Sequence, residues 1–104
     1  MIKQLVDNLE RLNLKYERED KLHRTVFKLF SQEGNSYSIT IYQNNTVEVN
    51  AIVGSVKTTL NGEFVSLQSW MPYYEKPYIS IAVAHSTANI ATSEICAEDL
   101  VHGN

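Results

Sequence analysis

The sequence predicts an α+β domain in which one N-terminal helix packs on an antiparallel sheet. Apolar residues recur at helical spacing near the start of the chain, and polar and apolar positions alternate over most of residues 25–83. The glycine-rich strand-to-helix turn of nucleotide-binding folds does not occur. We therefore predict a helix, a β-meander of five to six strands and a short C-terminal helix. At 104 residues, the chain is predicted to form a single domain, 1–104.

The helix is predicted by five apolar residues at spacings of three and four along one stripe, namely Ile2, Leu5, Val6, Leu9 and Leu12. The charged residues of the same segment fall away from this stripe. Such a stripe must be covered, most simply by the sheet.

Three strands are predicted next, over residues 25–31, 36–42 and 46–53, with a turn at 32–35. A two-residue turn before the third strand would place Ile41 opposite the charged Glu48. A three-residue loop over 43–45 instead places Ile41 opposite Val47. Because a slip of one residue moves every side chain to the other face, we predict the longer loop.

A hairpin is then predicted around Asn61-Gly62, the dipeptide that most favours a two-residue turn between alternating runs. It would pair Val56 with Leu67. Residues 78–85 alternate again and predict a further strand. The tail over residues 93–102 predicts a short helix, with Thr92 as its N-cap.

Composition and charge exclude several classes of function. The single cysteine, Cys96, cannot form an internal disulfide, and the N-terminal residues lack a signal-peptide pattern, so we expect a cytosolic protein. No apolar run is long enough for a membrane span. Residues 1–28 carry a net charge of +2 and the remainder −5, which disfavours nucleic acid as a partner. We expect no metal, no cofactor and no catalytic residue, because no spacing of ligands or nucleophiles predicts them.

The stretch "SWMPYYEKPY" is the strongest candidate for a binding site. Its two prolines restrict the backbone, and tryptophan, tyrosine and methionine are enriched in interface hot spots. We expect Trp70 to lie in the core and one of Tyr73 and Tyr74 to be exposed, because neighbours in an extended chain point opposite ways. The candidate binding residues are Trp70, Met71, Tyr73, Tyr74, Glu75, Lys76 and Tyr78.

The outward positions of the predicted strands form a second candidate surface. They are mostly small and neutral, at Ser36, Ser38, Thr40, Asn50, Thr59 and Ser66. A sheet face in water usually carries more lysine and glutamate. Either threonine and serine are there because they suit strands, or the face or an edge pairs with a partner, including a second copy of the chain.

These features predict a small non-enzymatic module that binds another, larger protein through the aromatic stretch and the sheet. Inhibitors, immunity-type proteins, chaperones and adaptors are of this kind, including those encoded by phages and other mobile elements. The alternative is a small-ligand protein or enzyme with a pocket between helix and sheet, lined by Tyr37, Tyr42 or His85. A third interpretation is a structural role with a homodimer formed through a sheet edge.

Overall fold

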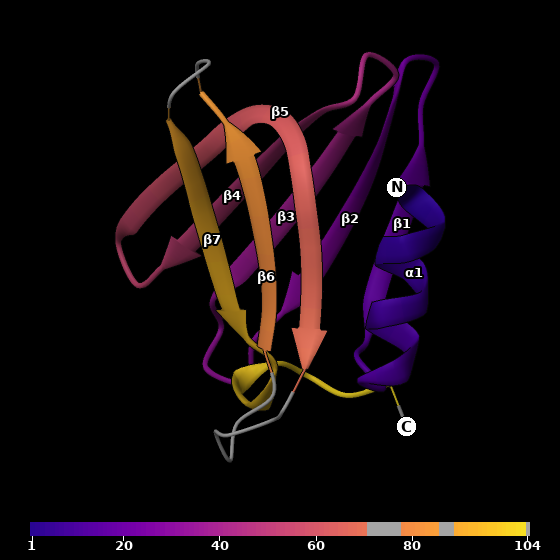
Figure 1. Ribbon diagram of the computed structural model, residues 1–104. Helices are drawn as coiled ribbons and strands as arrows, with labels where there is room; N and C mark the ends of the chain where they lie inside the picture. The colour runs from indigo at the N-terminus through magenta and orange to yellow at the C-terminus, as the bar shows by residue number, and fades with distance from the viewer. Residues whose placement is uncertain (71–77, 86–88, 104) are drawn as a thin grey trace.

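The computed structural model of the chain describes residues 1–70, 78–85 and 89–103, without the side chains of residues 69 and 70 (Figure 1). One helix, α1, precedes a seven-stranded antiparallel sheet in which every strand pairs with its neighbour in sequence. The elements are α1 (Ile2–Arg11), β1 (Tyr16–Asp20), β2 (Arg24–Phe30), β3 (Ser36–Tyr42), β4 (Thr46–Val53), β5 (Val56–Trp70), β6 (Tyr78–Ala84), β7 (Ile90–Cys96) and the 3-10 turn η1 (Ala97–Asp99). The predicted α+β class is confirmed, but the sheet has seven strands instead of five to six.

The predicted apolar stripe of α1 is confirmed. Leu5 and Leu9 are fully buried, and the other three residues of the stripe pack partly against the same core. The helix lies beside the sheet and contacts the second half of β5 (Figure 1). There, the Gln4 side-chain amide donates a hydrogen bond to the Leu67 carbonyl oxygen, at 3.5 Å.

The three-residue loop before β4 is also confirmed. Ile41 lies opposite Val47, and Ile39 opposite Val49. Asn45 closes this loop with φ at +66°, a left-handed conformation that asparagine tolerates better than most residues. All four of the paired side chains are buried in the core.

The predicted hairpin at Asn61-Gly62 is wrong, because both residues lie inside the single strand β5. The chain turns earlier, at Gly54-Ser55, where Val53 pairs with Val56 and Gly54 adopts a φ of +62°. Glycine followed by serine is itself a hairpin signal. Of the two turn signals, Gly54-Ser55 and Asn61-Gly62, the first along the chain forms the turn.

Asn61-Gly62 marks instead the point at which β5 changes neighbour. Residues 56–63 of β5 pair with β4, whereas residues 63–70 pair with β6. The register shifts between Phe64 and Ser66, which is a β-bulge. Bulges bend a strand and increase its twist, so β5 passes from one layer of a curved sheet to the other (Figure 1).

The two layers enclose one apolar core, which α1 closes at the side. Its residues alternate along β2, β3, β4 and β6, as the sequence pattern predicts. The largest of the fully buried side chains is that of Phe27 on β2, whose ring lies 6.0 Å from that of Tyr16 between centroids.

The predicted C-terminal helix over residues 93–102 is wrong. Residues 90–96 form β7, and only the single turn η1 follows. Ile95 pairs with Ile79 of β6 and is buried, so pairing with the sheet overrides the local helical preference. Strand β1 was not among the predicted strands, because "YERED" is charged and lacks an apolar alternation.

After η1, the chain forms a strap, residues 100–103, which connects segments far apart in sequence. The Val101 amide donates to the Phe30 carbonyl oxygen at 2.7 Å, and the Lys15 amide donates to the Val101 carbonyl oxygen at 2.9 Å. Leu100 is buried within the strap. The strap therefore joins the start of β1 to the end of β2.

Candidate functional site: the outer face of the sheet and the aromatic stretch

The aromatic stretch forms the connection between β5 and β6. Trp70 is the last residue of β5, and its backbone pairs with that of Tyr78, the half-buried first residue of β6. Tyr78 in turn pairs with Cys96, the last residue of β7. The other candidate residues, Met71, Tyr73, Tyr74, Glu75 and Lys76, lie outside the described residues, as does the predicted burial of the Trp70 side chain.

The second candidate surface is the side of β1–β5 that faces away from the core, called here the outer face. Five of the six small neutral residues lie on this side by register, although Thr40 is buried there, while Ser66 lies beyond the bend in β5. The antiparallel register sets its residues in rows, and one row runs through Glu17, Lys28, Ser38, Asn50 and Thr59. The outer face thus brings together residues from five strands.

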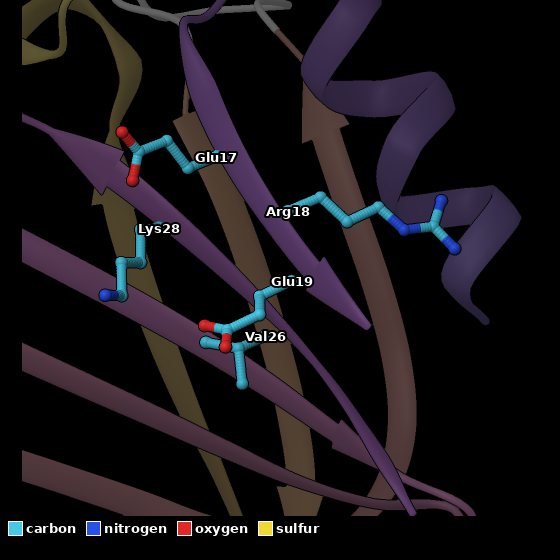
Figure 2. Close-up of a pocket in the computed structure, with 5 residues that line it drawn as sticks. All are labelled: Glu17, Arg18, Glu19, Val26 and Lys28. Carbon is cyan, nitrogen blue, oxygen red and sulfur yellow. The ribbon is translucent and has the colours of Figure 1, made fainter. Parts of the chain in front are cut away.

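One end of the outer face is hollowed over β1 and β2 (Figure 2). Glu17 and Glu19 of β1 and Val26 and Lys28 of β2 project to this side, whereas Arg18 projects toward α1 (Figure 2). The Arg18 guanidinium lies over the Phe27 ring, 5.6 Å from its centroid. This hollow therefore presents carboxylates and an ammonium group together, so its charge is mixed.

A second hollow, of about 330 Å³, lies further along the outer face over β2, β3 and β4. Ser36, Ser38 and Asn50 are among its lining residues, and Phe30 and Ile52 line it as well. Phe30 and Ile52 pair with the two sides of Ser36 in the sheet, so short polar side chains lie between apolar ones. Such a surface can receive an apolar side chain of a partner while leaving hydrogen-bonding groups within reach.

Hydrogen bonds between side chains order the polar part of the outer face. The Thr59 hydroxyl donates to the Asn50 Oδ1 at 2.7 Å, and the Asn50 amide donates to the Glu48 Oε1 at 3.1 Å. The Tyr42 hydroxyl donates to the other oxygen of Glu48, at 3.0 Å. This polar network links β3, β4 and β5, and it occupies both carboxylate oxygens of Glu48.

The network predicts a loss of stability at alkaline pH. The hydrogen bond to Glu48, followed by desolvation, raises the pKa of the Tyr42 phenol above its usual 10.0, and burial raises the pKa of Tyr37 in the same direction. Because the folded state favours the protonated phenols, the stability that these two groups contribute is fully present below pH 10 and is lost as the pH rises through their folded pKa values.

We expect Tyr42→Phe to reduce this alkaline fall, as measured by urea unfolding at a series of pH values between about 8 and 12. Tyr37→Phe should also reduce the alkaline fall in the free energy of unfolding, because burial, and not a hydrogen bond, raises the pKa of Tyr37. If the fall were as steep in Tyr42→Phe as in the wild-type protein, the hydrogen bond to Glu48 would not favour the protonated phenol.

The residues predicted for a pocket between helix and sheet do not come together. Tyr42 lies on the outer face, whereas Tyr37 packs against the core, and His85 is exposed beyond the end of β6. Between α1 and the sheet, the buried Leu5 and Leu9 side chains pack into the core cluster.

The other candidate groups are dispersed. Cys96 is half-buried at the end of β7. Within the part of the chain that the structure describes, no three His, Cys, Asp or Glu side chains are gathered as metal ligands would be. Near the β1–β2 turn, Lys21 forms an ion pair with Glu19, at 3.6 Å.

Sequence reasoning missed the apolar part of the outer face. Phe30 and Ile52 occupy positions that the alternation of their strands assigns to solvent, and this break in the pattern was the available signal. It also missed that Tyr42 would meet Glu48, because their contact depends on the register between β3 and β4.

The described helices include none with the length and apolar character that a membrane-spanning helix needs. Comparison of the chain with protein-family models, curated proteins and solved structures finds no match.

Proposed function

We propose that this chain is a small non-enzymatic binding module, of the inhibitor, immunity, chaperone or adaptor type, which acts on a larger protein. The binding surface would be the outer face together with the aromatic stretch, residues 69–78. A cytosolic location agrees with the single cysteine.

The observation that carries this proposal is the composition of the outer face around the second hollow. Small neutral side chains allow close approach, Phe30 and Ile52 supply apolar contact, and the polar network holds its groups in fixed positions. A face held in place before binding loses little conformational entropy when a partner covers it. These properties suit contact with a folded protein.

The aromatic stretch supports the proposal through its composition and through where it is attached. Both ends of the stretch belong to paired strands, because Trp70 and Tyr78 are opposite each other in the sheet. A connection fixed at both ends and containing two prolines has fewer conformations to lose on binding.

The test is an affinity capture with four tagged proteins: wild type, Tyr73→Ala/Tyr74→Ala, Ser38→Arg and Ser66→Arg. Ser38 lines the second hollow, so arginine there would obstruct it, whereas Ser66 is an equally half-buried strand serine beyond the bend. Circular dichroism and thermal unfolding first establish that all four are folded.

We expect wild type and Ser66→Arg to retain a common partner that the other two proteins lose. Retention of that partner by all four proteins would contradict both parts of the proposed surface. Loss in Ser38→Arg alone would restrict the surface to the outer face, and loss in Tyr73→Ala/Tyr74→Ala alone would restrict it to the aromatic stretch.

A further inference from the structure

The two edges of the sheet differ in how well they resist further strand pairing. At one edge, β1 carries four charged residues among its five, which is a common protection of edge strands. At the other edge, β7 carries a single charge, on Glu94. In the described sheet, β7 pairs with β6 on one side only.

The ladder between β6 and β7 determines which backbone groups of β7 point outward. The His85 amide donates to the Asn89 carbonyl oxygen, so these opposite residues form a hydrogen-bonded pair. Such pairs alternate along an antiparallel ladder, which turns Ala91, Ser93 and Ile95 toward β6. The residues whose N–H and C=O groups point away from β6 are therefore Ile90, Thr92, Glu94 and Cys96.

Exposed apolar side chains lie on the β4–β5 hairpin. Val53 and Val56 pair with each other on the core-facing side of the sheet, yet they are 48% and 60% exposed. We call them the valine pair. Along β4 and β5, they follow the paired residues Val49 and Leu60 on the same side of the sheet, beyond the end of the core.

The β4–β5 hairpin belongs to the layer of the sheet that passes behind β7 in Figure 1. At Gly62, β5 touches Val83 and Ala84 of β6, and β5 also contacts β7. Figure 1 shows the hairpin reaching the side of the molecule where the free edge of β7 lies. The end of this hairpin, which carries the valine pair, therefore lies on the side of the molecule to which a strand added to β7 would extend the sheet.

We propose that the free edge of β7 and the valine pair together bind an extended segment of a partner protein, which adds to the sheet as a further strand. Its inward side chains are apolar and contact Val53 and Val56. Its outward side chains include a lysine or arginine close to Glu94. This deepens the proposed function and rests on it only in that the ligand is a protein segment.

A second copy of the chain fits this edge less well than a single strand. Edge-to-edge pairing of two copies would bring both β4–β5 hairpins to the same side of the joined sheet. The two hairpins would then compete for the space beneath it. A single strand from a partner protein brings no second hairpin, so the valine pair alone occupies the space beneath the extended sheet.

The test uses the full chain and a synthetic peptide in which three valines alternate with threonines between terminal lysines. A control peptide carries proline in place of the central valine, because proline removes a donor from the ladder. Binding is followed by NMR titration of the backbone amides. We expect the largest shifts in β7 and in the β4–β5 hairpin with the valine peptide, and none with the proline peptide.

Four variants locate the contact. We expect Val56→Asp and Thr92→Pro to weaken binding of the valine peptide at least about tenfold, and Ile52→Asp and Thr92→Ala to leave it within about twofold. Ile52 is on the same hairpin with 44% exposure but on the outer face. The Thr92 amide points away from β6, so proline there spares the existing ladder. If Thr92→Pro does not fold, the comparison of Val56→Asp with Ile52→Asp still tests whether the peptide contacts the valine pair.

The proposal is overturned if the wild-type protein does not bind the valine peptide, or if Val56→Asp binds it as well as Ile52→Asp does. It is also overturned if light scattering shows a wild-type dimer that Thr92→Pro abolishes, since the edge would then belong to a second copy. A failed affinity capture alongside normal peptide binding would count against the outer face and the aromatic stretch, and not against the edge.

Discussion

Gly62→Ala is expected to destabilise the protein by at least about 1–3 kcal/mol, the range for forcing extra atoms into a packed site. A Cβ at Gly62 would fall on the Ala84 carbonyl oxygen and would lie 3.0 Å from its carbonyl carbon and 3.2 Å from the Val83 Cβ. The obstacle is mainly backbone, which cannot rotate away. In an ordinary strand, the same change would be favourable by about 0.5–1 kcal/mol, so the expected sign is reversed.

Urea unfolding of wild type, Gly62→Ala and Gly103→Ala would measure this effect. Gly103 is the matched control, because the nearest atom to a Cβ there is the Leu14 carbonyl oxygen at 3.7 Å, an ordinary contact. Gly103→Ala should change the free energy of unfolding by less than about 0.5 kcal/mol. A Gly62→Ala protein as stable as wild type would show that the two layers do not approach so closely at the bend.

Phe27→Ala is expected to lower the free energy of unfolding by about 3–5 kcal/mol, the cost of removing a buried aromatic side chain and leaving a cavity. Phe27 is fully buried and also contacts Tyr16 and Arg18 from β1. Small domains have a total stability of only about 5–15 kcal/mol, so this variant should unfold at a much lower urea concentration.

The loss of stability in Phe27→Ala should be compared with that in Phe30→Ala, which changes a residue three positions further along β2. Phe30 is half-buried on the outer face, with the Lys15 ammonium 5.8 Å from the centre of its ring. It should lose less stability than Phe27→Ala while altering the second hollow. Equal losses from both substitutions would mean that the two sides of β2 are not distinguished as core and solvent.

The parts of the fold that could be predicted from sequence are those set by strong local periodicity. The stripe of α1 and the alternation of β3 and β4 each place one set of apolar residues in the core, and this was enough to choose the loop over residues 43–45. In contrast, Asn61-Gly62 is a turn signal whose glycine is required for another reason, the close approach of Ala84. That reason exists only once β5 and β6 have come together.

The helix predicted for residues 93–102 was wrong for a similar reason, since the conformation there depends on contacts that exist only in the folded chain. Residues 93–102 have an acceptable helical pattern, but Ile95 is buried opposite Ile79 when the segment is extended. A free sheet edge at β6 decides between the two conformations, and that edge is a product of the folded chain. The β1 strand was missed because its partner β2 determines its conformation while its own side chains are mostly exposed.

The candidate site was predictable to a smaller extent. The neutral outward residues followed from alternation, but the grouping of Phe30, Ile52 and the polar network depends on how four strands are aligned. The valine pair could not be inferred at all. Val53 and Val56 have the spacing of core residues, and they are exposed only because the hairpin extends past the core.

The strap has a kinetic consequence. In a meander, each strand meets the next one along the chain, so these pairings close short loops and can form quickly. The strap instead pairs Leu14 with His102, which closes a loop of nearly the whole chain. The entropy of that closure is recovered only after the sheet exists. The folding order should therefore place the meander first and the strap last, and the strap should also be the first part to detach when the native protein opens locally.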